Sequence, residues 1–140
     1  GTIAHTATIC VAVVGTEDRW KAIGVDIEPA IGIDETLWDT ICTPGERRQL
    51  SEHAPAARAM LATRVFVAKE AFYKWHYPQE RTMLDFLDVS VSWSAGGSDF
   101  EVSPHGPQTH ERVRVCSGRL FALGGHVVAY CTTRAHGSRR

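Results

Sequence analysis

Hydrophobic positions along this chain repeat with two different periods, and each period predicts a different kind of element. From Arg58 to Trp75 apolar residues recur at three- and four-residue steps, which predicts a long helix with one core-facing stripe: Leu61, Val65, Ala68 and Phe72. His76-Tyr77-Pro78 is expected to end this helix. Capping residues and an early proline predict shorter helices from Asp34 to Cys42 and from Pro44 to Glu52.

Runs rich in β-branched residues flank these helices and predict strands. Residues 8–14 and 22–27 are two such runs, and the polar segment 16–19 between them predicts a hairpin. Five further strands are expected after the long helix: 86–93, 99–103, 112–115, 119–123 and 127–132. This order predicts a single domain over residues 1–140 with an α+β fold, in which an antiparallel sheet packs against a long helix plus shorter helices.

Composition narrows the function classes. The chain has 140 residues and a formal net charge of −1, so nucleic acid is not an expected partner. Its longest apolar run, residues 9–14, is far shorter than the roughly twenty residues of a membrane span. The four cysteines show no CxxC spacing, which favours free thiols in a reducing cytoplasm over a zinc site.

Charged residues inside two apolar stretches are the strongest chemical signal. Asp26 and Glu28 alternate along a predicted strand and therefore share one face. Glu70 and Lys74 are i, i+4 neighbours on the long helix, and Lys69 is offset from Glu70 by about 100°. If strand and helix pack together, three carboxylates converge beside two lysines, an arrangement that holds Mg²⁺ and a polyphosphate.

Four segments together resemble the 4′-phosphopantetheinyl transferases. Gly24-Val25-Asp26-Ile27-Glu28 is similar to the family's acidic strand, and Lys69-Glu70-Ala71-Phe72-Tyr73-Lys74, about forty residues later, to its helix motif. Thr2-Ile3-Ala4-His5 resembles the family's His-containing lead-in, and Pro44-Gly45-Glu46-Arg47 lies where the family has a helix start with an acidic residue. The likeness covers most of residues 1–94 and implies the family's half-domain fold.

The resemblance implies a reaction and its residues. Members transfer the 4′-phosphopantetheine arm of coenzyme A to a serine of an acyl or peptidyl carrier protein and release adenosine 3′,5′-bisphosphate. Three acids match the family's ligands for Mg²⁺, with Mn²⁺ as the alternative metal: Asp26, Glu28 and Glu70. Four residues match its contacts with coenzyme A: His5 for the 3′-phosphate, Lys69 and Lys74 for the other phosphates, and Tyr73 for the pantetheine arm.

The chemistry requires such residue types. Charge must be neutralised as serine attacks a diphosphate, and a divalent cation and lysines supply that neutralisation. Glu70 is the expected acceptor of the serine proton, directly or through metal-bound water, with Lys69 beside it at the reacting phosphate.

Each feature alone has a plainer explanation. Glu70 with Lys74 could be an ordinary helix pair, Asp26 with Glu28 could end a strand at the surface, and a lone histidine such as His5 is usually structural or solvated. The motifs in this order favour the functional interpretation for the acids with Lys74, and also for His5. Two further sets are most simply solvated surface, although the arginines could dock an acidic carrier protein: His105 and His110, and Arg47, Arg48 and Arg58.

The branch of the family is indicated by the first thirty or so residues. A His-containing lead-in and a strand precede Gly24, and Pro29 follows Glu28, which resembles the C-terminal half of the larger, two-half surfactin- and enterobactin-synthetase-like type. Such enzymes serve siderophore, polyketide or nonribosomal peptide biosynthesis. A missing N-terminal half of roughly one hundred residues, carrying nucleotide-binding basic residues, is then expected upstream.

Two alternatives stay open beside the transferase. The chain could be a non-catalytic carrier-protein-binding module on the same half-fold. An unrelated Mg²⁺- or nucleotide-dependent enzyme is disfavoured because the sequence has no P-loop or Gly-rich phosphate cradle.

Overall fold

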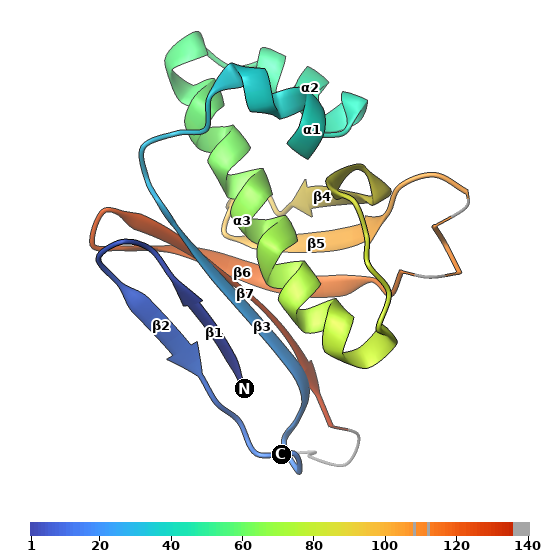
Figure 1. Cartoon of the computed structure of the whole chain (residues 1–140). Helices are drawn as coiled ribbons and strands as arrows, with labels where there is room; N and C mark the ends of the chain where they lie inside the picture. Colours follow the sequence, from blue (N-terminus) through green and yellow to red (C-terminus); the bar gives the residue numbers. More distant parts are fainter. Residues whose placement is uncertain (108, 112, 136–140) are drawn as a thin grey trace.

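A long helix, α3 (Pro55–Glu80), crosses one face of an antiparallel sheet in the computed structural model of the chain (Figure 1), which describes residues 1–107, 109–111 and 113–135. The sheet has five strands in the order β3-β7-β6-β5-β4. Their bounds are β3 Trp20–Pro29, β4 Val89–Trp93, β5 Asp99–Pro104, β6 Cys116–Leu123 and β7 His126–Arg134. The predicted α+β fold, an antiparallel sheet against a long helix, is confirmed.

A separate two-stranded sheet, β1 (Thr2–His5) and β2 (Cys10–Val13), lies against the opposite face of β3. Ala4 packs there with Val25 and Ile27 of β3 in a small apolar cluster. The predicted hairpin between residues 8–14 and 22–27 is therefore wrong, since β2 pairs with β1 while β3 pairs with β7. Strand pairing over a hundred residues of sequence leaves no local turn signal.

Helix α3 is longer at both ends than the sequence pattern predicts. It begins at Pro55, where a proline suits the first turn, and it continues past Pro78 to Glu80. The helix ends at Arg81, whose φ of 54° is left-handed and whose N–H donates to the Tyr77 carbonyl over 2.9 Å. The predicted end at residues 76–78 is wrong. No helix in the described part of the chain is long and apolar enough to cross a membrane.

Short helices cover the N-terminal half of α3 (Figure 1): the 3-10 turn η1 (Glu35–Leu37), α1 (Trp38–Ile41) and α2 (Pro44–Ser51). The Thr43 hydroxyl caps α2 by accepting the Glu46 N–H, and the Glu46 carboxylate accepts the Thr43 N–H. The predicted helix start is therefore confirmed. Helix α3 is thus buried against the sheet on one side and against α1 and α2 on another.

Among the C-terminal strands, β5 begins at Asp99 as predicted, whereas β4 and β6 begin elsewhere. Residues 86–88 form a 3-10 turn, η2 (Phe86–Asp88), so β4 begins only at Val89. In the predicted strand 112–115, Arg112 lies outside the described residues and residues 113–115 are irregular. Strand β6 begins instead at Cys116 and so includes the whole predicted strand 119–123.

Candidate active site

The alternation of β3 turns two acids toward α3. Gly24 lies on the same strand face, and a Cβ atom there would be 2.1 Å from the Ala71 carbonyl oxygen and 2.4 Å from the Trp75 nitrogen. Strand and helix backbones therefore touch at Gly24, which only a residue without a side chain permits. Because side chains on one strand face recur every second residue, Asp26 and Glu28 continue along the same line beside α3.

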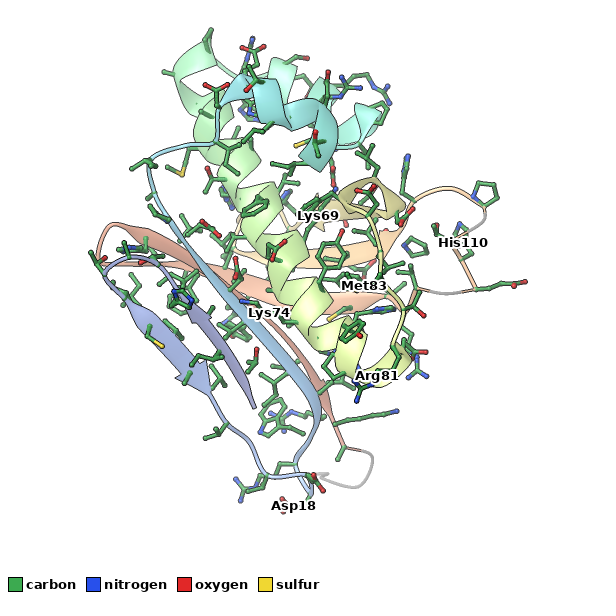
Figure 2. The ribbon with its side chains drawn as sticks, viewed as in Figure 1. Asp18, Lys69, Lys74, Arg81, Met83 and His110 are labelled. Atoms are coloured by element: carbon green, nitrogen blue, oxygen red, sulfur yellow. The ribbon has the colours of Figure 1, made fainter. Side chains whose placement is uncertain are left out.

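Lys74 of α3 meets Asp26 directly. Its Nζ lies 2.8 Å from Asp26 Oδ1 and 3.3 Å from the carbonyl oxygen of Ile3 in β1, and Figure 2 shows Lys74 between α3 and β3. Asp26 is only 5% exposed, and its second oxygen, Oδ2, is buried without a hydrogen-bond partner among the described residues. A buried carboxylate oxygen without a partner has a free coordination position.

The three predicted acids share one electrostatic environment. Burial, and then repulsion from Asp26 and Glu70, raises the pKa of Glu28 to about 7. Burial and the charge of Asp26 also raise the pKa of Glu70. Burial raises the pKa of Asp26 in spite of Lys74. One ammonium group among three carboxylates leaves negative charge uncompensated, so the cluster favours a further positive charge.

The donor set of this cluster fits a hard divalent cation, because carboxylates are the ligands that Mg²⁺ takes from proteins. In the conformation described, Lys74 occupies Asp26 Oδ1, and no three His, Cys, Asp or Glu side chains of the described residues stand in a metal-holding arrangement. The assignment of Asp26, Glu28 and Glu70 as metal ligands stays a prediction, supported by the unpartnered oxygen and the mutual repulsion.

Lys69 does not join this cluster, although it directly precedes Glu70. Its side chain is 0% exposed, and Nζ donates to the Ile41 carbonyl at 2.8 Å, to Glu46 Oε2 at 2.8 Å and to the Phe86 carbonyl at 2.7 Å. Three acceptors use all three ammonium protons. The phosphate contact predicted for Lys69 receives no support from this placement and stays a prediction for a different conformation.

Tyr73 lies beside Glu70 on the wall of a cavity of about 320 Å³, here called the Tyr73 cavity. Its hydroxyl donates to the Asp85 carbonyl over 2.8 Å, and burial raises its pKa well above the ordinary value, so the phenol is neutral. The lining is mostly apolar and comprises Glu70, Tyr73, His76, Tyr77, Thr82, Met83, Leu84 and Phe86. This placement is consistent with the predicted contact between Tyr73 and an apolar arm.

His5 is exposed at the end of β1. The next residue, Thr6, has its Oγ1 3.3 Å from Nε2 of His126, and His126 pairs with Pro29 of β3. His5 therefore lies near the Glu28 end of β3, although its predicted nucleotide contact is untested. The predicted solvation of His105 and His110 agrees with their exposed positions.

The arginines considered for carrier docking are partly engaged within the chain. Arg47 pairs with Asp39, and Arg58 donates to the carbonyls of His53 and Ser51 at 2.9 and 3.1 Å. Arg47 and Arg48 stay exposed on α2. Docking at this helix stays a prediction.

Two residues near the site have contacts that the sequence does not indicate. Glu46 is identifiable as a capping-box acid, yet its carboxylate also accepts hydrogen bonds from Lys69 Nζ and, at 2.7 Å, from the Val91 N–H. Gly24 is visible as part of the acidic strand motif, but its contact with the helix backbone depends on the packing of the two elements.

Comparison with known proteins gives the family. The family model of the 4′-phosphopantetheinyl transferase superfamily matches residues 22–131, most of the chain and both halves of the acidic cluster. The chain belongs to the 4′-phosphopantetheinyl transferase superfamily.

Individual relatives agree with that assignment. The chain is 34% identical over 93 residues to the 4′-phosphopantetheinyl transferase PptT of Mycobacterium tuberculosis, covering 66% of this chain and 40% of that protein. It is 30% identical over 93 residues to the 4′-phosphopantetheinyl transferase Npt of Nocardia iowensis, covering 66% of this chain and 41% of that protein. The match thus spans about two fifths of the length of these curated relatives.

Solved structures share the fold. A holo-ACP synthase from Plasmodium yoelii superposes with a TM-score of 0.62 at 17% identity, covering 84% of this chain and 97% of that chain. The holo-[acyl-carrier-protein] synthase of Neisseria meningitidis superposes with a TM-score of 0.61 at 20% identity, covering 83% of this chain and 98% of that chain. At these identities the likeness concerns the fold alone.

Proposed function

We propose that this chain carries the catalytic acids of an enzyme that transfers the 4′-phosphopantetheine arm of coenzyme A to a serine of an acyl or peptidyl carrier protein. The observation that supports this most strongly is the electrostatic coupling of Asp26, Glu28 and Glu70 to one another and to Lys74, with one buried Asp26 oxygen left unpartnered among the described residues. Family membership and the relatives PptT and Npt point to the same reaction.

The residues of the cluster have different proposed roles, which follow from the chemistry of their side chains. A bound Mg²⁺, or Mn²⁺, would be held by Asp26, Glu28 and Glu70 and would neutralise charge on the diphosphate. Lys74, whose side chain is 33% exposed, can offer its ammonium group to a phosphate oxygen. Glu70 accepts the serine proton, directly or through a water molecule, because it is the acid that lies on α3 at the Tyr73 cavity.

The proposed step conserves atoms and charge. The serine Oγ forms a bond to the phosphorus that bears pantetheine, and the bond from that phosphorus to the bridging oxygen breaks. Adenosine 3′,5′-bisphosphate leaves with the bridging oxygen and its electron pair, while the serine proton passes to Glu70. The Tyr73 cavity, adjoining Glu70, would hold the pantetheine arm, and His5 near the Glu28 end of β3 would face the nucleotide's 3′-phosphate.

The proposal includes an upstream half. In the two-half branch of the family, nucleotide-binding basic residues come from the first half, and the match to about two fifths of PptT and Npt agrees with such an arrangement. Siderophore, polyketide or nonribosomal peptide carriers are the proposed substrates. A reducing cytoplasm, compatible with the four free cysteines, is the proposed compartment.

The test is transfer by the full-length protein. Apo carrier protein is incubated with coenzyme A and Mg²⁺, and mass spectrometry follows the addition of one phosphopantetheine group. We expect modification that stops with a chelator and returns with added Mg²⁺. A protein that binds the carrier tightly but never modifies it would refute the transferase proposal and favour the carrier-binding module.

A further inference from the structure

A fully buried ion pair lies directly behind the proposed active site. Glu46 and Lys69 are 2.8 Å apart, with side chains 4% and 0% exposed. Glu46 also accepts the N–H groups of Thr43 and Val91, each at 2.7 Å. The carboxylate therefore ties α2 to β4 as well as to α3.

Lys69 extends these ties to two further segments. Its ammonium group donates to the Ile41 carbonyl at the end of α1 and to the Phe86 carbonyl in η2. Five elements thus meet at one pair of opposite charges: α1, α2, α3, η2 and β4. In Figure 2 Lys69 lies in the middle of α3, beside η2 and β4.

Stability alone is a weak reason to bury such a pair. Removing two charges from water carries a large desolvation cost, and well-packed apolar residues in their place are often as stable or more so. What a buried, fully hydrogen-bonded pair supplies is a defined position for the groups that it binds.

The groups that Lys69 holds in position include one wall of the Tyr73 cavity. Lys69 and Tyr73 are one helical turn apart on α3, and they bond consecutive carbonyls, those of Phe86 at 2.7 Å and Asp85 at 2.8 Å. These two bonds fix residues 85–86 against the turn of α3 that carries Glu70. Phe86 itself lines the cavity, and its ring contacts Tyr73 with centroids 5.4 Å apart.

We infer that Lys69, held by Glu46, is a positioning residue that sets the cavity wall at residues 85–86 beside Glu70 and thereby governs binding of the pantetheine arm. This inference rests on the proposed function for the identity of the arm. It differs from a direct phosphate contact, because every ammonium proton of Lys69 already has an acceptor inside the chain.

The test compares two ligands on the full-length protein with Mg²⁺. Coenzyme A carries the arm, whereas 3′-phosphoadenosine 5′-diphosphate keeps all the phosphates and lacks it. The variant is Glu46→Gln with Lys69→Met, which removes both charges together and leaves no single buried charge. We expect nucleotide affinity within about twofold of wild type, coenzyme A affinity lowered about tenfold, and transfer lowered on the order of 10²-fold, as a displacement of about 1 Å can cause.

Two matched variants make the result specific. Tyr73→Phe removes the neighbouring bond to Asp85 and should lower coenzyme A affinity, again without changing nucleotide affinity. Lys74→Met should lower the affinity for both ligands. Hydrogen exchange should quicken at the amides of residues 84–88 in the double variant and in Tyr73→Phe, while β3 keeps its protection.

Equal losses of affinity for both ligands in the double variant would overturn the inference in favour of a phosphate contact. A lower melting temperature with unchanged binding, transfer and exchange would overturn it in favour of a purely structural pair. If wild-type protein binds coenzyme A but modifies no carrier, the proposed function fails separately, and the difference between the two ligands still decides the role of Lys69.

Discussion

Gly24 is the position where fold and proposed site are most directly coupled, so Gly24→Ala is the sharpest perturbation. The new methyl group would lie 2.1 Å from the Ala71 carbonyl oxygen, where ordinary contact begins at 3.4 Å, a shortfall of about 1.3 Å. The atoms met belong to the helix backbone and cannot rotate away. Overpacking costs about 1–3 kcal/mol, and we expect the upper end here because two backbones must separate.

The predicted effects are measurable in one preparation. A loss of about 3 kcal/mol corresponds to a fall in melting temperature of about 10 °C for a domain of this size. Because Asp26 follows Gly24 on the same strand face, the shift also lengthens its 2.8 Å bond with Lys74, so transfer to a carrier should fall as well. Thermal unfolding and the carrier assay, both on the full-length protein, give the two quantities.

Gly96→Ala is the matched control, since a Cβ at Gly96 meets no atom within 4 Å. It should change stability by no more than about 0.5 kcal/mol and leave transfer unchanged. If Gly24→Ala behaved like Gly96→Ala, the close approach of β3 and α3 would be refuted, and with it the route by which Asp26 reaches α3.

Three further predictions concern the charges of the cluster. Glu70→Gln should lower the transfer rate by about 10²-fold or more, and unchanged turnover would remove its role as proton acceptor. Lys74→Met leaves buried Asp26 without its partner, so calorimetry should show weaker coenzyme A binding and the melting temperature should fall; normal values of both would exclude the contact. In metal-free protein the folded state keeps a proton on Glu28 that the unfolded chain releases near pH 4.5, because its pKa is raised to about 7. That stabilisation is present below about pH 4.5 and is lost as pH rises toward 7, so the melting temperature should fall across this window, and Glu28→Gln should flatten the fall.

Most helices and strands were predictable because the residues that signal them lie within the element or directly beside it. The capping box at Thr43 and Glu46 predicts the start of α2, and the apolar steps between Arg58 and Trp75 predict the middle of α3. Pairing of β3 with β7 was not predictable in the same way, since nothing between residues 14 and 20 shows that β3 pairs with a distant strand.

The two lysines of the helix motif show the limit of motif reasoning at the site. The sequence places both next to Glu70, and the structure brings only Lys74 to the acids. Lys69 is rotated by about 100° from Glu70 around the axis, toward α1, α2 and η2. A helix buried on several sides has no single polar face, so the sequence alone does not indicate which side a lysine will occupy.

The burial of α3 also explains where a site can form on it. Ten of its side chains are buried, and Glu70, Tyr73 and Lys74 are among those that keep partial exposure along the stretch facing β3 and the Tyr73 cavity. Glu70, Lys74 and the cavity residue Tyr73 therefore lie in the segment of α3 that also contacts Gly24 of β3. Since one packing contact positions both the charges and the cavity, substitutions that loosen β3 from α3 should affect binding and turnover together, whereas substitutions at the Lys69 pair should separate arm binding from nucleotide binding.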